Sequence, residues 1–326
     1  MLFTRYITVS IMAIFMLSMQ SAYSTTADTS LKGKKVLYID SYHEGYVWSD
    51  GVTQGIRDGL KGTGVELKVF RMDTKRNRDE EFKQASALKA KALIESYKPD
   101  IVIASDDNAS KYLIVPHFKN SDLPFVFCGL NEELSVYGYP FKNTTGMVEQ
   151  HLVKPVIHQL SLQAKGKRLG FLGSNTLTSR KSQQSYTDKQ QITFDKVYFA
   201  TDFDDWKSAF IKIQTEVDIL ILNGPRHIVN WDEKQAMEFV QQNTKIPTGA
   251  VASWVMPFAM LGIVLVPEGH GQWAASSALK ILRGAEPNSI PIHHDTDGKL
   301  MLNMKISQQL DLTFTMQQLR IAELLR

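Results

Sequence analysis

Clusters of polar and aromatic residues follow several of the strands that the sequence predicts. The loop Ser-Tyr-His-Glu-Gly-Tyr-Val-Trp at residues 41–48 carries three aromatic rings, which can stack on a flat ligand or close over an apolar one. Asp106 and Asp107 end a strand that begins at Ile101, and a carboxylate there can bind a ligand ammonium group. In the alternative interpretation, the rings complete the hydrophobic core and one aspartate caps the next helix. Nothing in the sequence separates the pKa values of the two aspartates, so no catalytic pair is predicted.

Two further segments after predicted strands are rich in turn-forming residues. Gly-Ser-Asn-Thr at 173–176 and Asn-Gly-Pro at 223–225 can offer backbone NH groups and side-chain amides to a carboxylate. Ordinary turn formation explains the same residues equally well. The predicted ligand-binding residues are Ser41, Tyr42, Tyr46, Trp48, Asp106, Asp107, Asn131, Ser174, Asn175, Thr176, Asn223, Ser253 and Trp254.

The histidines and the single cysteine form no recognisable catalytic or metal-binding motif. His293 and His294 are adjacent, and neighbouring strand residues face opposite sides, so we expect an exposed pair and no metal site. His270 lies between two glycines and is expected in a loop. Cys128 closes an apolar run and is expected to be a buried strand residue. The GxSxG, P-loop, GxGxxG and HExxH motifs are absent, and neither an enzymatic activity nor a cofactor is predicted.

A repeating alternation of strands and helices positions these residues. The predicted strands are at 35–40, 65–70, 101–104, 125–128, 145–148, 168–172, 196–199, 218–222 and 249–252. The predicted helices are at 49–60 with Ser49 as N-cap, 80–97, from about 109, 153–162, 205–215, 231–242 and 271–283 with Gly284 as the stop. This order predicts an α/β fold with parallel sheets that carry helices on both faces. Ligands of such sheets bind beyond the carboxyl ends of the strands.

The pattern restarts near the middle of the chain, which predicts two Rossmann-like lobes joined by a hinge. We expect a first lobe of residues 35–143 and 260–287 and a second lobe of residues 144–259 and 288–326. In this division the strand at 145–148 opens the second lobe, and the chain returns to the first sheet near 261–266. A hydrophobic content of 43% in 326 residues is enough for two cores. The net charge of +3 and the short, interrupted basic clusters exclude a nucleic-acid footprint.

Residues 1–24 have the layout of a cleavable signal peptide, with one cation at Arg5, an apolar run, and small residues up to Ser24. The apolar run is shorter than the ~20 residues that a membrane-spanning helix needs. Thr25 would follow the cleavage site, so no cysteine is available for lipid attachment. After a leader at 25–34, the chain is therefore predicted to be a periplasmic protein that is neither lipidated nor stably inserted in the membrane.

Four segments together resemble the ABC-transporter substrate-binding family that includes tryptophan- and tyrosine-binding proteins. They are VLYIDSYHEGYVWSDGVTQGIRDGL, DIVIASDDNA, LPFVFCGLN and GHGQWAASSALKILRGAEPNSIPI. The same pattern occurs in extracytoplasmic sensing domains of bacterial histidine kinases and cyclic-di-nucleotide enzymes. The resemblance implies a type I periplasmic-binding-protein fold, with ligand contacts from residues 41–48, Asp106, Asp107 and Asn131. The loop after Leu172 departs from the family pattern, so amino-acid specificity is not carried over.

The sequence thus predicts a binding protein that captures a small ligand between its lobes, such as an amino acid or a similar polar or aromatic metabolite. Its predicted partner is the permease of an ABC importer. One alternative is that it presents the ligand to a membrane sensor kinase or diguanylate cyclase. Another alternative, from a different class, is a small exported hydrolase. The sequence names neither the ligand nor the oligomeric state.

Overall fold

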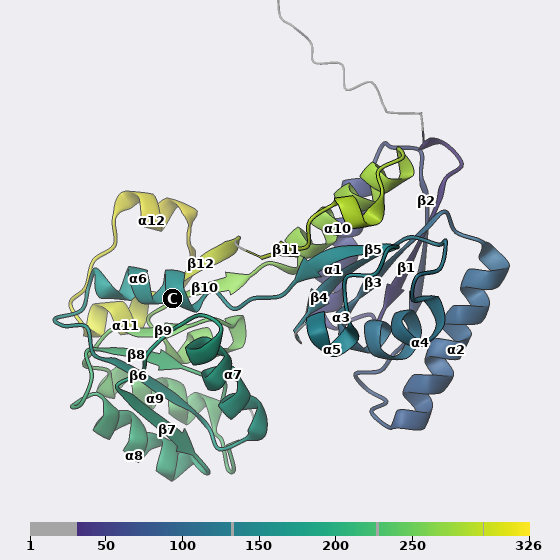
Figure 1. Ribbon diagram of the computed structural model, residues 1–326. Coiled ribbons are helices and arrows are strands. Elements are labelled where there is room, and N and C mark those ends of the chain that lie inside the picture. Colours follow the sequence, from purple (N-terminus) through teal and green to yellow (C-terminus); the bar gives the residue numbers. More distant parts are fainter. Residues whose placement is uncertain (1–30, 132–133, 226–227, 296) are drawn as a thin grey trace, which may run out of the picture.

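The computed structural model describes residues 31–131, 134–225, 228–295 and 297–326, which form two lobes (Figure 1). The predicted signal peptide and residues 25–30 of the predicted leader lie outside the described residues. In the part of the chain that the structure describes, no helix is long and apolar enough to span a membrane.

The first lobe is built on a parallel sheet with the strand order β11, β5, β4, β3, β1, β2. Its strands are β1 (Lys35–Asp40), β2 (Glu66–Arg71), β3 (Ile101–Ser105), β4 (Phe125–Leu130), β5 (Thr144–Val148) and β11 (His293–His294). Its helices are α1 (Val47–Leu60), α2 (Glu80–Tyr97), α3 (Asp106–Ala109), the π-helical η2 (Ser110–Ile114), α4 (Val115–Phe118), α5 (Leu134–Tyr137), α10 (Pro267–Leu282) and the 3-10 turn η4 (Pro287–Ser289).

The second lobe is built on a sheet with the strand order β13, β12, β10, β9, β8, β6, β7. Its strands are β6 (Leu169–Ser174), β7 (Lys196–Ala200), β8 (Ile219–Leu222), β9 (Thr248–Ala250), β10 (Leu261–Leu265), β12 (Gly298–Asn303) and β13 (Glu323–Leu325). Its helices are α6 (Val153–Ser161), α7 (Leu177–Asp188), α8 (Phe203–Ile213), α9 (Glu233–Asn243), the 3-10 helix η3 (Ser253–Phe258), α11 (Met304–Gln309) and α12 (Met316–Ile321). Of the pairings in this sheet, β10 with β12 is antiparallel.

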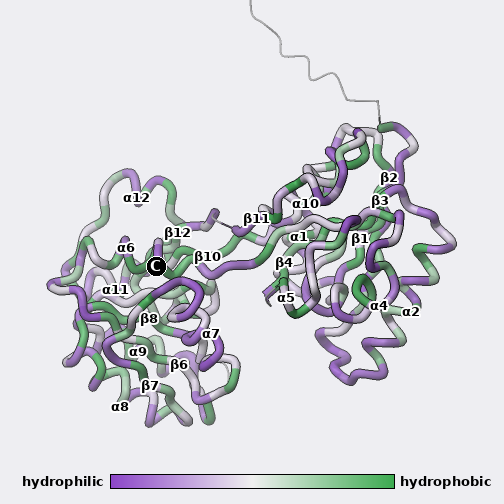
Figure 2. The backbone as a smooth tube through the Cα atoms, viewed as in Figure 1, coloured by the Kyte–Doolittle hydropathy of each residue, from purple (hydrophilic) through white to green (hydrophobic). Residues whose placement is uncertain are grey.

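The central strands are buried on both faces, which explains why they are almost continuously apolar. Every residue of β3 and β8 is buried, and helices pack on both sides of each sheet (Figures 1 and 2). Parallel strands between two layers of helices have this composition because neither face meets water. The predicted α/β class with mainly parallel sheets is confirmed. Cys128 is fully buried in β4, also as predicted.

Two strands join the opposite sheet from the one that the sequence predicted. β5 pairs with β4 in the first sheet, and β10 pairs with β9 and β12 in the second. An apolar run indicates a buried strand, but it does not indicate which sheet the strand joins. The chain therefore crosses between the sheets after Val148, after Leu265 and after His294.

The ends of two helices test the predicted caps. Ser49 is not the N-cap of α1, because the helix begins at Val47 after Tyr46. The Ser49 hydroxyl instead donates to Asp40 Oδ1 at 2.9 Å. Gly284 does end α10, with a positive φ of 104° and its N–H bonded to the Ile281 oxygen at 2.9 Å. Together with a bond from Ala285 to the Lys280 oxygen, this is a Schellman motif.

Helices α1 and α10 touch along their backbones. Gly51, Gly55 and Gly59 are spaced by four residues, so they share one face of α1, and this face meets α10. A side chain at Gly55 would overlap the Glu268 carbonyl oxygen, and one at Gly271 would overlap the Val52 carbonyl oxygen. We call this contact the glycine seam. It fixes the returning helix α10 on the first lobe.

Gly271→Ala is expected to lower the free energy of unfolding by about 1–3 kcal/mol, because a methyl group in the glycine seam must push the two helices apart. Gly269→Ala is the matched control on the same helix. Nothing lies within 4 Å of its would-be side chain, and alanine favours the helix. Thermal unfolding followed by circular dichroism compares the two variants, and equal melting temperatures would show that the seam is not tight.

Candidate ligand-binding cleft

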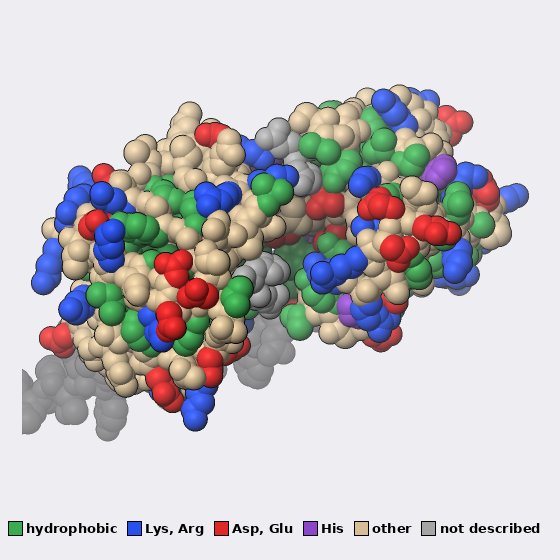
Figure 3. All heavy atoms as spheres, turned by 90° about the horizontal axis from the view of Figure 1, so that it is seen from below, with side chains coloured by type: hydrophobic (Ala, Val, Ile, Leu, Met, Phe, Trp, Pro, Cys, Tyr) green, Lys and Arg blue, Asp and Glu red, His purple; other side chains and the backbone are tan. Residues whose placement is uncertain are grey.

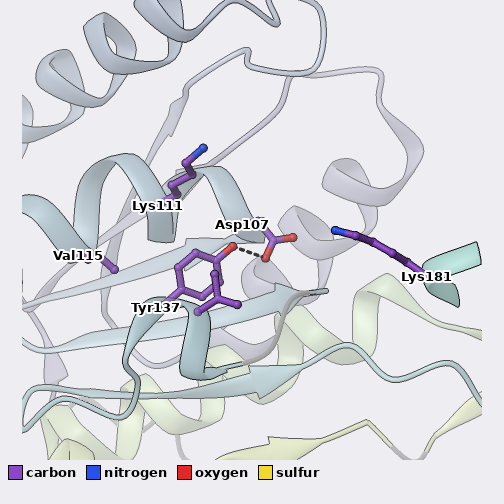
Figure 4. Close-up of a pocket in the computed structure, with 6 residues that line it drawn as sticks. Asp107, Lys111, Val115, Tyr137 and Lys181 are labelled. Atoms are coloured by element: carbon purple, nitrogen blue, oxygen red, sulfur yellow. Dashed lines mark hydrogen bonds between the residues drawn. The ribbon is translucent and has the colours of Figure 1, made fainter. Parts of the chain in front are cut away.

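A cavity of about 560 Å³ lies between the lobes. It is lined by Asp107, Lys111, Val115, Val136, Tyr137 and Lys181. Lys181 comes from α7 of the second lobe, whereas the other residues follow β3 and β4 of the first. Figure 4 shows the Asp107 carboxylate between the Tyr137 hydroxyl and the ammonium end of Lys181. The cavity is therefore an interlobe cleft at the carboxyl ends of the parallel strands, where such sheets bind ligands.

The aromatic loop after β1 is only partly available to a ligand. The Tyr42 and Tyr46 rings meet edge to face with centroids 5.3 Å apart. Lys75 Nζ lies 4.6 Å from the Tyr42 ring centroid and 5.0 Å from that of Tyr46, so these rings already hold a cation. Trp48 contacts His270 at 5.1 Å between ring centroids. Its indole Nε1 is buried and has no hydrogen-bond partner.

Asp106 is the most unusual residue of the cleft. It adopts a left-handed backbone conformation, with φ of 67°, and its side chain is buried. Its Oδ2 atom has no hydrogen-bond partner. Burial raises the pKa of Asp106 well above its usual range, and the charges of Asp40 and Glu149 raise it further. A strained backbone and an unsatisfied buried carboxylate are features that binding sites retain at a cost in stability.

Gly129 keeps open the space beside Asp106. Its φ is 68°, a conformation that favours glycine. A Cβ atom at this position would lie 3.4 Å from both Asp106 Oδ1 and Trp48 Nε1. The unpartnered indole donor and the buried aspartate therefore flank the same small space.

Asp107 is held in place by neighbouring polar groups. The Tyr137 hydroxyl donates to its Oδ1 at 2.8 Å, and the backbone and side-chain nitrogens of Asn131 lie 3.4 Å from its Oδ2. Neither aspartate caps α3, because the helix begins at Asp106 and Ser105 is its N-cap. The expected capping role is therefore wrong, and Asp107 instead presents its carboxylate to the cleft (Figure 4).

Ser41 lies in the interior of the first lobe. Its hydroxyl donates to the Ser105 carbonyl oxygen at 2.5 Å and accepts from the Ala109 N–H at 2.9 Å. These bonds join β1, the end of β3 and helix α3. The hydroxyl thus positions the strand ends that carry the cleft residues.

Local turn chemistry accounts for the loop that follows β6. Thr176 is the N-cap of α7, with its hydroxyl accepting from the Ser179 N–H at 3.2 Å. The Ser174 hydroxyl lies 3.2 Å from that of Thr176. Asn175 Oδ1 accepts from Arg180 Nη2 at 2.7 Å. These residues lie at the end of their strand, and their side chains are hydrogen-bonded within the loop and helix α7.

Two other predicted segments of the second lobe keep groups for a ligand. Asn223 follows β8, and its Oδ1 accepts from the Gly224 N–H at 2.7 Å while its Nδ2 is buried without a partner. Ser253 and Trp254 begin η3, after β9, and both are exposed. Asn223 Nδ2 is thus a candidate hydrogen-bond donor at a strand end of the second lobe.

Glu149 is a largely buried carboxylate at the strand ends that the sequence analysis did not single out, and its N–H donates to the Leu130 carbonyl oxygen at 2.8 Å. It directly follows β5, and its Oε1 lies 3.9 Å from His151 Nε2. Burial raises the pKa of Glu149 to about 8, and the charges of Asp107 and Asp295 add to the shift. Burial also lowers the pKa of His151 to about 4, so this ring is neutral near pH 7. Polar residues that directly follow a strand were the predicted site residues. Glu149 would have been among them if β5 had been assigned to the first sheet.

A buried histidine–aspartate pair lies at the crossings between the lobes. His270 is fully buried inside α10, and its Nε2 lies 2.8 Å from Asp295 Oδ2. The prediction of a loop for His270 is therefore wrong, because the residue lies within α10 and Gly271 beside it packs against α1. His293 and His294 form β11, where His293 stacks on Trp273 and His294 is exposed. Among the residues that the structure describes, no group of three His, Cys, Asp or Glu side chains can hold a metal ion.

Several acidic groups lie at the strand ends of the first lobe, where Asp107 and Lys111 both line the cavity. Figure 3 shows carboxylate side chains in the hollow between the lobes. The residues that affect one another electrostatically there are Asp40, Asp106, Asp107, Glu149 and Asp295. Arg71 Nε lies 3.4 Å from Asp40 Oδ2, so Asp40 has its own cation. Asp295 is paired with His270, so Asp107 is the carboxylate that lines the cavity and suits a ligand with hydrogen-bond donors.

Comparisons with known proteins agree with this geometry. A family described as ABC transporter substrate binding protein matches residues 48–323. No curated protein is significantly similar to the chain in sequence.

Several solved structures share the fold. The ligand-free, open structure of CD0873, a substrate binding protein with adhesive properties from Clostridium difficile, has 15% identity and a TM-score of 0.69, with 90% of this chain and 99% of that chain covered. The ABC domain in complex with L-Trp from Streptococcus pneumonia has 18% identity and a TM-score of 0.53, with 89% and 99% covered. A periplasmic ribose ABC transporter structure from Conexibacter woesei has 13% identity and a TM-score of 0.54, with 86% and 96% covered. The two-lobed type I periplasmic-binding-protein fold is thereby confirmed.

Asp106→Asn is expected to stabilise the ligand-free protein at pH 8 by an amount on the order of 1–3 kcal/mol, and to have little effect near pH 4. Because the pKa of Asp106 is raised, the folded state binds more protons than the unfolded state above the ordinary aspartate pKa, and its stability falls as the pH rises. Asparagine keeps the shape and tolerates the left-handed backbone. Melting temperatures of both proteins from pH 4 to pH 9 measure this, and parallel curves would contradict it.

Proposed function

Because the chain belongs to the ABC transporter substrate-binding protein family, we propose that it captures a small organic ligand in the interlobe cleft and delivers it to an ABC importer. The family consists of binding proteins, which hold their substrates without converting them. The observation that carries the proposal is the unpartnered indole Nε1 of Trp48, which lies with the Asp106 carboxylate beside Gly129. The Oδ2 atom of that carboxylate is also buried without a partner. The indole and the carboxylate offer one donor and one acceptor to the same space.

An empty cleft leaves these two atoms at an energetic disadvantage. A buried polar atom without a hydrogen-bond partner costs roughly 1–3 kcal/mol. A ligand that bonds to both removes this cost and contacts the indole ring as well. Asp107 lines the cleft, and Tyr42 and Asn223 are further candidate contacts at strand ends, so an amino acid or a similar polar or aromatic metabolite fits the size and chemistry of the cleft.

Exposed apolar side chains on the facing edges of the lobes support a closing motion. Val136 of the first lobe is 64% exposed, and Leu177 and Trp254 of the second lobe are 72% and 49% exposed. All three follow strands at the carboxyl ends of the sheets. Closure around a ligand would remove such surface from water at about 25 cal/mol per Å². Ligand binding and apolar burial then favour the same closed state.

The first 24 residues support export to the periplasm. They have the composition of a signal peptide, and Thr25 offers no cysteine for lipid attachment. A binding protein that is exported in this way meets its permease at the outer face of the inner membrane. Amino-terminal sequencing of the protein recovered from a periplasmic fraction tests the cleavage after Ser24.

Native mass spectrometry of freshly purified protein, followed by thermal-shift screening of amino acids and flat polar metabolites, tests the function. L-tryptophan, which the Streptococcus domain binds, is the first compound to test. The expected result is a compound that binds unchanged, raises the melting temperature and loses affinity at least tenfold in Trp48→Ala. Turnover of the bound compound would contradict the proposal.

Leu177→Asp is expected to weaken ligand-induced closure, because a charge on this edge opposes burial between the lobes. The matched control is Leu162→Asp, since Leu162 is also in the second lobe and is 63% exposed, but follows α6 away from the cleft. Small-angle X-ray scattering with and without the ligand found in the screen measures the decrease in radius of gyration. An equal decrease in both variants would show that this edge does not close.

A further inference from the structure

Two opposite charges face each other across the cavity from different lobes. Asp107 belongs to α3 of the first lobe and Lys181 to α7 of the second, and both line the same cavity of about 560 Å³. Figure 4 shows the Lys181 side chain extended, with its ammonium end directed toward the Asp107 carboxylate. Among the described residues that line the cavity, Lys181 is the one that comes from the second lobe. This pair of charges therefore spans the space that a closing motion would narrow.

Lys181 has no ionic partner within its own lobe. The described residues place no carboxylate within 4 Å of its ammonium group. Its neighbour Arg180, in contrast, donates to Asn175 Oδ1 at 2.7 Å. The other lysine of the cavity, Lys111, lies 3.8 Å from Glu80 Oε2 of its own lobe. The charge of Lys181 is thus available to a partner on the opposite side of the cavity.

Asp107 is oriented before any such contact forms. The Tyr137 hydroxyl donates to its Oδ1 at 2.8 Å, and two nitrogens of Asn131 lie 3.4 Å from its Oδ2. A carboxylate accepts about four hydrogen bonds, so these neighbours leave room for an ammonium group. Because the acceptor is already held in place, an ion pair would order mainly the lysine side chain.

The apolar edges of the lobes match the same pairing. Leu177 and Lys181 are four residues apart in α7, so they lie on one face of the helix, and Leu177 is 72% exposed. On the first lobe, the exposed Val136 lines the cavity together with Asp107. A motion that brings the two apolar side chains together also brings the lysine to the aspartate.

We propose that Lys181 and Asp107 form an ion pair when the lobes close, and that this interlobe ion pair holds the closed state. The inference rests on the proposed function, because it concerns the closure that captures the ligand in the same cleft. Lys181 is a positioning residue, since its partner is the other lobe and not the ligand.

The expected effect is small enough to keep closure reversible. A partly exposed ion pair changes an equilibrium by about two- to fivefold. The ratio of closed to open molecules changes by that factor when the pair is lost, and ligand affinity changes with it while the closed state is the minor one. Salt screens the attraction, with a Debye length of about 3 Å at 1 M, so added salt lowers the closed fraction.

Carbodiimide coupling of the ligand-free protein tests the contact directly. This reagent joins a carboxylate to an amine only where the two groups touch, and the covalent link accumulates each time the lobes close. Peptide mass spectrometry is expected to detect a link between Asp107 and Lys181 that is absent from Lys181→Gln. Lys34 and Asp100 are the internal control, because their charged atoms lie 2.9 Å apart within the first lobe. Their link without the interlobe link would overturn the proposal.

Charge exchange then tests whether the pair holds the closed state. Lys181→Glu should lower the ratio of closed to open molecules by at least about twofold, because two carboxylates then face each other. Adding Asp107→Lys to this variant should restore the ratio. Lys165→Glu is the matched control, since it makes the same change of charge at an exposed residue of the second lobe that does not line the cavity.

Single-molecule fluorescence energy transfer measures this ratio without a ligand. The dyes are attached to Leu88→Cys in α2 and Met237→Cys in α9, which are exposed and on different lobes, while the native Cys128 is fully buried. An equal closed fraction in Lys181→Glu and Lys165→Glu, or no recovery in the double variant, would overturn the proposal. Circular dichroism spectra that match the parent show that each variant is folded.

The outcomes separate this inference from the proposed function. If Lys181 instead holds an anionic group of the ligand, the interlobe link does not form in the ligand-free protein and the closed fraction does not depend on residue 181. A compound that binds in the screen while no link forms leaves the proposed function standing and overturns the ion pair. If the link forms and no compound binds, the contact between the lobes is established and the proposed function is overturned.

Discussion

The three connections between the lobes meet at one buried carboxylate, Asp295. Its N–H donates to the Val148 carbonyl oxygen at 3.2 Å, just before the first crossing. Its Oδ2 lies 2.8 Å from His270 Nε2, just after the second crossing, and its Oδ1 accepts from the Asp297 N–H at 3.0 Å within the third. Because breaking such a joint would leave a buried carboxylate without partners, we infer that a relative motion of the lobes would keep these contacts of Asp295. Glu149 lies one residue beyond Val148, at the start of the first crossing.

This joint depends on a contact between two helices that are far apart in the sequence. His270 reaches Asp295 only if α10 lies flat against α1, and the glycine seam permits that approach. Gly55 and Gly271 each sit against a carbonyl oxygen of the opposite helix. Any larger residue would move α10 outward and carry His270 with it. The glycines of α1 therefore have a role in lobe geometry, although they lie outside the cleft.

Local patterns predicted most of the strands and helices, because buried parallel strands are apolar and their ends are marked by turn residues. Residues 41–48, Asp107 and the turn at 173–176 were correctly placed at strand ends for this reason. The pairing of β5 and β10 was not predictable locally, since it depends on contacts between distant segments. Because β5 was assigned to the wrong sheet, the sequence analysis did not identify Glu149. His270 was mistaken for a loop residue because glycine is a common turn former. Position 271 needs glycine for another reason, since a side chain there would overlap the Val52 carbonyl oxygen of α1.

The two faces of the cleft differ in what they can offer a ligand, and the difference implies an order of events. The first lobe presents Asp107 and Tyr137 to the cavity, with the buried Asp106 beside them in α3. In the second lobe Thr176 and Asn175 are bonded within their own turn, so its contribution comes from Asn223 Nδ2, Lys181 and the apolar edge. A ligand held first by the carboxylates gains these contacts only on closure. Because closure requires a higher affinity in the closed state, the proposed function assigns the two lobes different roles: the second lobe would control the conformation that a partner recognises, and the first lobe would control which ligand enters.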